Sequence, residues 1–140
     1  GGVKSLSDAE LRRLCSPDHV NDMAFVALAA EPGDLESQRQ VGVCRYAGAS
    51  SAQGAEISVA VADDWQHQGL GKKLLRRLIE HARAHGVKRL YSIDSVANDR
   101  MRELGAKLGF RESPEPGDRR QVHLSLELRL GQEAETRARP

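Results

Sequence analysis

The segment with the clearest chemistry is Gln66-His67-Gln68-Gly69-Leu70-Gly71-Lys72, which places two glycines directly before a predicted helix. The first turn of a helix has backbone N–H groups without partners, and the helix dipole adds partial positive charge there. Glycine lets a ligand approach the backbone closely, and Lys72 and Lys73 add further positive charge. The segment therefore predicts a binding site for a phosphate or diphosphate.

Two common phosphate motifs do not fit this segment. A P-loop needs a glycine five residues before Gly71, where Gln66 stands, and a Ser or Thr after the lysine, where Lys73 stands. A dinucleotide fingerprint needs a third glycine at Leu74. A tight turn without a ligand is the simpler alternative, but the agreement between strand, loop and helix favours a ligand.

The elements that position this loop follow from hydrophobic spacing. Residues 55–61 alternate as a strand, with Glu56 on the face opposite Ile57 and Val59. Residues 72–85 form a predicted amphipathic helix closed by Gly86. Further strands are expected at 23–28, 40–46, 87–94 and 120–130, and further helices at 8–15 and 98–108. This order predicts a mixed α/β domain over residues 1–130, with right-handed strand–helix–strand crossovers beside an antiparallel meander and a flexible tail at 131–140.

Composition restricts the possible partners and setting. The 140 residues carry a formal net charge of +1 and only 4% aromatic residues, which disfavours nucleic-acid binding. The longest apolar run, residues 23–30, is far below the roughly 20 residues of a membrane span. Two cysteines form neither a disulfide framework nor a zinc site, and His81 and His85 have no third ligand nearby, so no metal is expected. A cytoplasmic location is the simplest expectation.

The motifs together resemble the GNAT family of N-acetyltransferases. Gln66-x-x-Gly69-x-Gly71 matches its acyl-CoA signature, and Asn98 followed by Lys107-Leu108-Gly109-Phe110 matches a second hallmark; the resemblance covers residues 23–128. It implies a mostly antiparallel sheet flanked by helices, here with shortened N-terminal elements, and acetyl-CoA as cosubstrate. The cofactor-binding residues that it implies are Val59, Ala60, Val61, Gln66, His67, Gln68, Gly69, Leu70, Gly71, Lys72 and Asn98. Asn98 is also a suitable N-cap.

A narrower similarity links residues 23–27, 41–46 and 55–57 to the catalytic domain of bacterial protein-lysine acetyltransferases. It implies direct attack of an amine on the thioester, with Glu56 as the general base. A base helps because only on the order of one lysine amine in a thousand is unprotonated at neutral pH. An exposed glutamate on a solvated face is the alternative for Glu56. Many family members have a tyrosine where Gly105 stands, so no acid is assigned for the leaving thiolate.

Three hypotheses follow. The first is an acetyltransferase acting on a protein lysine or on a small primary amine. The second is an acyl-CoA-binding sensor with weak or no turnover, and the third is a small basic nucleic-acid module, suggested by seven basic residues and one acid in residues 72–89. Acceptor specificity is expected in the loops at 31–39, 48–54 and 111–119, and a homodimer is left open.

Overall fold

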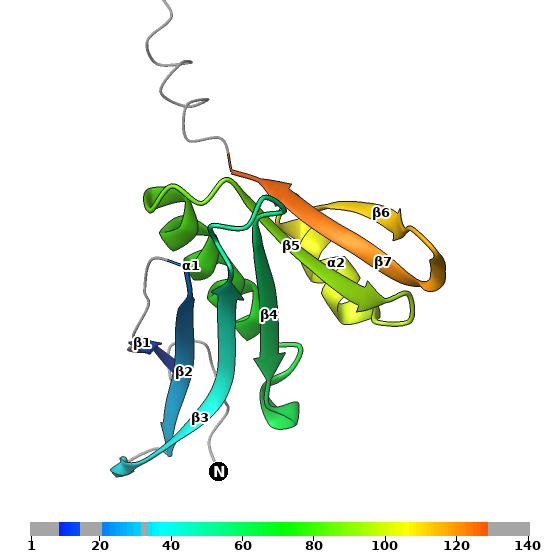
Figure 1. Cartoon of the computed structure of the whole chain (residues 1–140). Coiled ribbons are helices and arrows are strands. Elements are labelled where there is room, and N and C mark those ends of the chain that lie inside the picture. Colours follow the sequence, from blue (N-terminus) through cyan, green and yellow to red (C-terminus); the bar gives the residue numbers. More distant parts are fainter. Residues whose placement is uncertain (1–8, 15–20, 32–33, 129–140) are drawn as a thin grey trace, which may run out of the picture.

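A seven-stranded sheet carries two helices in the computed structural model, which describes residues 9–14, 21–31 and 34–128 (Figure 1). The strands lie in the order β1-β2-β3-β4-β5-β7-β6. Their bounds are β1 Ala9–Leu14, β2 Met23–Glu31, β3 Asp34–Ala47, β4 Ala55–Val61, β5 Arg89–Ser95, β6 Arg111–Glu115 and β7 Asp118–Glu127. The helices are α1 Leu70–Ala84 and α2 Asp99–Lys107, and a short 3₁₀ turn, η2, spans Asp63–Trp65.

The strand pairing is antiparallel everywhere in this described sheet except between β4 and β5. Helix α1 connects these two parallel strands, as the sequence predicted. The second connection, β5-α2-β6, leads to a strand that is separated from β5 by β7. The expected mixed, mostly antiparallel sheet is therefore confirmed.

The helix predicted over residues 8–15 is wrong, because Ala9–Leu14 forms β1 at the edge of the sheet and pairs with β2. A capping-box pattern at residues 7–10 and the helical spacing of Leu11 and Leu14 are the local signals that predict a helix here. The side chains of Glu10 and Arg12 form an ion pair at 3.2 Å, which is possible because residues i and i+2 of a strand share a face. Backbone pairing with a neighbouring strand outweighs a weak local preference for helix.

The core lies between the sheet and one layer that contains both helices. The leucine stripe of α1 is confirmed, since Leu74, Leu75 and Leu78 are fully buried. Each such side chain contributes about 1.5–3 kcal/mol through burial. Helix α1 begins at Leu70, two residues earlier than predicted, so the glycine loop enters the helix directly.

Strands β4 and β5 pair over a very short distance and then diverge. Their register contains only Ala55 with Leu90 and Glu56 with Tyr91. Gly54 allows this close approach, because a Cβ there would lie 2.5 Å from the Arg89 carbonyl oxygen and the residue has a φ of +97°. Beyond Tyr91 the strands separate, and Figure 1 shows the resulting split in the sheet.

The tail expected to be flexible at 131–140 and the side chain of Cys15 lie outside the described residues. Within the described part, no helix is long and apolar enough to cross a membrane.

Candidate active site

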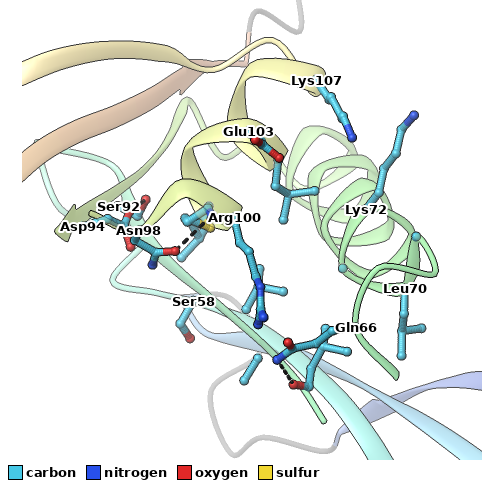
Figure 2. A pocket seen from close by; sticks show the side chains of 18 of the residues that line it. Ser58, Gln66, Leu70, Lys72, Ser92, Asp94, Asn98, Arg100, Glu103 and Lys107 are labelled. Atoms are coloured by element: carbon cyan, nitrogen blue, oxygen red, sulfur yellow. Dashed lines mark hydrogen bonds between the residues drawn. The ribbon is translucent and has the colours of Figure 1, made fainter. Parts of the chain in front are cut away.

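A cleft of about 710 Å³ opens where β4 and β5 separate (Figure 2). Its walls are β4, the loop before α1, the end of β5 and the helix α2. Residues from both faces of β4 line it: Ile57, Val59 and Val61 on the helix side, and Glu56, Ser58 and Ala60 on the open side. The cleft therefore lies in the split between the two strands and is bordered by residues from both faces of β4.

The N-terminus of α1 forms one end of this cleft. Gly69 is the N-cap, with a φ of 82°, and it provides no side-chain cap for the first turn. His67 also has a positive φ of 63°, which is uncommon for a residue other than glycine. The first turn contains no acidic residue and includes Lys72. Unpaired amides, the helix dipole and this lysine together suit an anion.

Gly71 keeps the space in front of these amides open. A Cβ at this position would lie 3.6 Å from Leu104 Cδ2, 3.7 Å from Val61 Cγ2 and 4.0 Å from Val59 Cγ1. These are ordinary contact distances, so a side chain would fit sterically but would project between β4 and α2. The fold therefore does not require glycine at this position for steric reasons, and the missing side chain leaves room for a ligand.

The glutamines of the loop have structural partners. The Gln66 amide Nε2 donates to the Val61 carbonyl and to the Asp63 carboxylate, both at 3.2 Å, which ties the loop to the end of β4 (Figure 2). Gln68 donates to the Asp64 carbonyl at 3.4 Å. Among the predicted cofactor residues that the structure describes, Gln68 is not in the cleft wall, whereas the other ten are.

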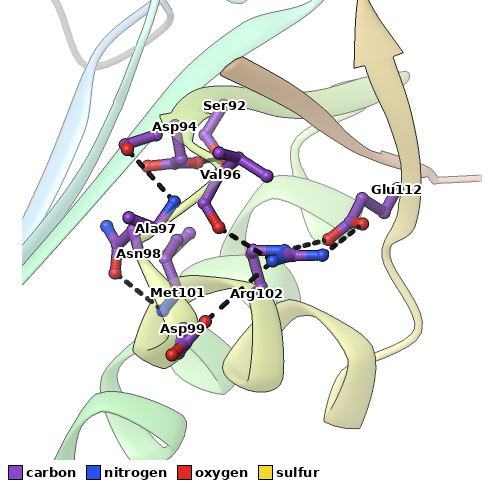
Figure 3. A network of polar contacts seen from close by, with 10 residues as sticks. Ser92, Asp94, Val96, Ala97, Asn98, Asp99, Met101, Arg102 and Glu112 are labelled. Atoms are coloured by element: carbon purple, nitrogen blue, oxygen red, sulfur yellow. Dashed lines mark hydrogen bonds and ion pairs between the residues drawn. The ribbon is translucent and has the colours of Figure 1, made fainter. Parts of the chain in front are cut away.

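Asn98 caps α2 and faces the cleft. Its side-chain oxygen accepts a hydrogen bond from the Met101 N–H at 3.2 Å, so the amide nitrogen is the part that remains for a ligand. The turn is held in place by Arg102, which forms a bidentate pair with Glu112 at 2.8 and 3.0 Å and donates to the Val96 carbonyl (Figure 3). The hydrogen bonds from Arg102 lower the pKa of Glu112. This network fixes α2 against β6.

Sequence reasoning missed the charged residues that α2 adds to the cleft. Arg100, Glu103 and Lys107 all line it, and Figure 2 shows Arg100 extending from α2 toward Gln66. Their spacing after Asn98 was visible in the sequence, but only the packing of α2 beside α1 directs them to this cleft.

Sequence reasoning also missed a polar pair on β5. Ser92 is only 4% exposed and donates a hydrogen bond of 2.6 Å to the Asp94 carboxylate. Both residues line the cleft on the helix side and lie beyond Tyr91, the last residue of β5 that pairs with β4. The alternation of side chains along the strand indicates that Ser92 and Asp94 share a face, but it does not show where the pairing of β5 with β4 ends.

Glu56 lies at the opposite side of the split. It is exposed, lines the cleft and is paired in register with Tyr91 of β5 and Ala47 of β3. Its carboxylate is therefore on the open face of the sheet, while the bare amides of α1 are on the helix face.

Other candidate groups lie away from the cleft. His81 stacks on His85 with ring centroids 3.9 Å apart, and the described residues contain no group of three or more potential metal ligands. Burial raises the pKa of the Cys44 thiol to about 12, which makes it a poor nucleophile.

The family model described as "Acetyltransferase (GNAT) family" matches residues 5–110, which is most of the chain. The chain belongs to this family. A Pseudomonas aeruginosa protein named as an acetyltransferase is 43% identical over 128 residues, covering 91% of this chain and 67% of that protein. This GNAT chain is thus an acetyltransferase that uses acetyl-CoA.

Solved structures support the same fold. The GNAT domain of a Streptomyces lividans protein described as PAT has a TM-score of 0.65 and 23% identity, covering 81% of this chain and 64% of that chain. A Salmonella typhimurium structure solved with its cofactor acetyl-CoA has a TM-score of 0.61 and 25% identity, covering 77% and 65%. This GNAT chain spans about two thirds of the length of each of these proteins.

Proposed function

We propose that this chain transfers the acetyl group of acetyl-CoA to a primary amine that enters from the open face of the sheet, with Glu56 as the general base. The observation that carries the proposal is the cleft in the split between β4 and β5, which is lined by the N-terminus of α1 on the helix side and by Glu56 on the open side. An amine that approaches the split from the open face comes beside this carboxylate.

The residues of the cleft fit the cosubstrate. The bare amides at residues 70–72, with Lys72, would hold the diphosphate, and Arg100 would add a second cation from α2. Among the described residues, the edge of β4 from Ser58 onward has no partner strand on the side of β5, so the main chain of Val59, Ala60 and Val61 would pair with the amides of the pantetheine arm. Bound acetyl-CoA supplies the activated acetyl group as a thioester.

The role of Glu56 follows from proton balance. An alkyl ammonium must lose a proton before its nitrogen can attack a carbonyl, because its pKa is about 10.4. A carboxylate beside the entry path accepts this proton, directly or through a water molecule. The new C–N bond forms as the C–S bond breaks, and the sulfur leaves with the electron pair as a thiolate. The second N–H proton, which the nitrogen loses as the amide forms, passes to this thiolate, directly or through water, and gives free CoA thiol.

The acceptor that fits best is a lysine of a protein. The open face around Glu56 is a broad strand surface without a covering helix in the described part of the chain, which suits a macromolecular acceptor (Figure 1). A small primary amine is the second candidate, because the split itself would admit one. Acetyl-CoA sensing without turnover is the third, since Gly105 packs under Leu124 and Phe110 and brings no acidic hydroxyl to the cleft.

The test is Glu56→Gln, which keeps the size of the side chain and removes the base. We expect kcat to fall by a factor of roughly 10² to 10⁴, with the affinity for acetyl-CoA unchanged. Glu80→Gln on the outer surface of α1 is the matched control and should retain full kcat. Full turnover by Glu56→Gln would eliminate the base assignment. Tight binding of acetyl-CoA by the wild type without transfer to any lysine peptide or small amine would favour the sensor.

A further inference from the structure

Three side chains form a continuous surface beside Glu56 on the open face of the sheet. Tyr91 is the register partner of Glu56 on β5, and its ring stacks on that of His123 from β7, with centroids 5.6 Å apart and planes 28° apart. Ile93 lies two residues after Tyr91 and is the register partner of His123. The surface formed by Tyr91, Ile93 and His123 is called the platform below.

The exposure of Ile93 is unusual in this chain. Its side chain is 42% exposed, and in the described part of the chain Val96 is the other large hydrophobic residue with such exposure. Isolated exposed hydrophobic residues are common and need no explanation. Ile93, however, lies at the wall of the cleft and beside two aromatic rings, so its apolar surface continues into the split.

We propose that the platform is the acceptor-binding surface, and that the acceptor carries its amine on an unbranched alkyl stem, as a lysine side chain does. The inference rests on the proposed function, in which an acceptor approaches Glu56 from the open face. On β5 the side chains of Tyr91 and Ile93 lie on the same face as Glu56, and His123 of β7 lies beside them. Acceptor selection then lies on the strands β5 and β7, whereas the segments 34–39 and 111–115, which were expected to be acceptor loops, belong to strands β3 and β6.

The chemistry of the platform selects against other amines. Alkyl carbons pack on Ile93 and on the ring faces, and an ammonium near a ring face is attracted by the ring quadrupole before it reaches the Glu56 carboxylate. An amino sugar would place hydroxyl groups on this apolar surface, where they lose hydrogen bonds to water. A primary amine without a stem would reach Glu56 without contacting the rings.

The experiment measures acetylation of a series of amines at saturating acetyl-CoA. The series contains Nα-acetyl-lysine amide, its analogues with stems shorter by one and by two methylenes, and glucosamine. We expect kcat/KM to fall with each methylene removed and to be lowest for glucosamine. Tyr91→Ala and Ile93→Ser should lower kcat/KM for the lysine compound by roughly tenfold, while Tyr91→Phe, which keeps the ring, should restore it.

Val96→Ser is the matched control, because Val96 is equally exposed but is not in the wall of the cleft. It should leave kcat/KM unchanged, and every variant should keep the wild-type dissociation constant for acetyl-CoA. Equal rates with glucosamine and lysine, or platform variants that match the wild type, would overturn the inference and leave amine acetylation by Glu56 intact. Absence of transfer to every amine in the series, with acetyl-CoA bound, would overturn the proposed function as well.

Discussion

Replacing Gly71 by alanine should separate cofactor binding from folding. The residue lies in the first turn of α1, and its added Cβ would meet Leu104, Val61 and Val59 at 3.6 Å or more, so no steric conflict arises. Alanine is also a better helix former than glycine by up to about 1 kcal/mol. We therefore expect the free energy of unfolding to stay the same or to rise.

Binding of acetyl-CoA should weaken in the same variant. The methyl group would occupy the space between β4 and α2 through which a diphosphate must approach the amides of α1. Losing one hydrogen bond to a charged group costs about 1.5–3 kcal/mol. Since every 1.4 kcal/mol changes a dissociation constant tenfold, titration calorimetry should show affinity reduced by roughly ten- to a hundredfold.

The other end of α1 provides the reciprocal control. Gly86 has a φ of +80° and open space around it, so alanine there strains the backbone without touching the cleft. Gly86→Ala should lower the thermal midpoint and leave acetyl-CoA affinity unchanged. Wild-type affinity in Gly71→Ala would refute the diphosphate site at this helix, as would a loss of affinity that merely parallels a loss of stability.

Three further predictions concern the elements around the site. Asn98→Ala should lower the free energy of unfolding by about 0.5–2 kcal/mol, and Asn98→Asp, which keeps the cap oxygen at 3.2 Å from the Met101 nitrogen, should retain most of it in urea titrations. Gly54→Ala should destabilise the chain more than Gly48→Ala, whose φ is also positive but whose added Cβ would meet nothing within 4 Å, and calorimetry can compare the two. Burial, reinforced by the charges of His85, Arg13 and Arg77, lowers the pKa of His81. The unfolded chain therefore takes up this proton first, so stability should fall as the pH drops below about 6.5, and less so in His81→Gln.

Local patterns predicted those parts of the fold that depend on local forces. The stripe of Leu74, Leu75 and Leu78 repeats over several turns, so its period identified α1 without any knowledge of its neighbours. At residues 7–14 a capping-box pattern and two leucines at helical spacing predicted a helix, but the strand that forms there depends on pairing with β2, which the local sequence does not reveal. An edge strand forms by pairing with another strand of the sheet, so the residues of the edge strand alone give little indication that it will form.

The same distinction explains the site. The loop at residues 66–72 was visible because its glycines and the following helix are contiguous in the chain. Arg100 and Lys107 became part of the cleft only through the position of α2, which the Arg102–Glu112 pair holds against β6. Tertiary packing therefore determines which of the charged side chains line the cleft, and the local sequence does not show it.

The point at which β4 and β5 separate determines how an acceptor reaches Glu56, the candidate base. If the two strands stayed paired beyond Tyr91, Glu56 would lie on a closed sheet, and ladder hydrogen bonds would separate it from anything held at α1. Because pairing stops at Glu56 and Tyr91, Ser92 on one face and Glu56 on the other border the same opening. In the proposed reaction, a thioester and an amine that approach from opposite faces then meet in the split, with the anionic cosubstrate on the helix side and the Glu56 carboxylate on the open side. The sequence alternation of β4 fixed the two faces, but only the tertiary split joins them into one site.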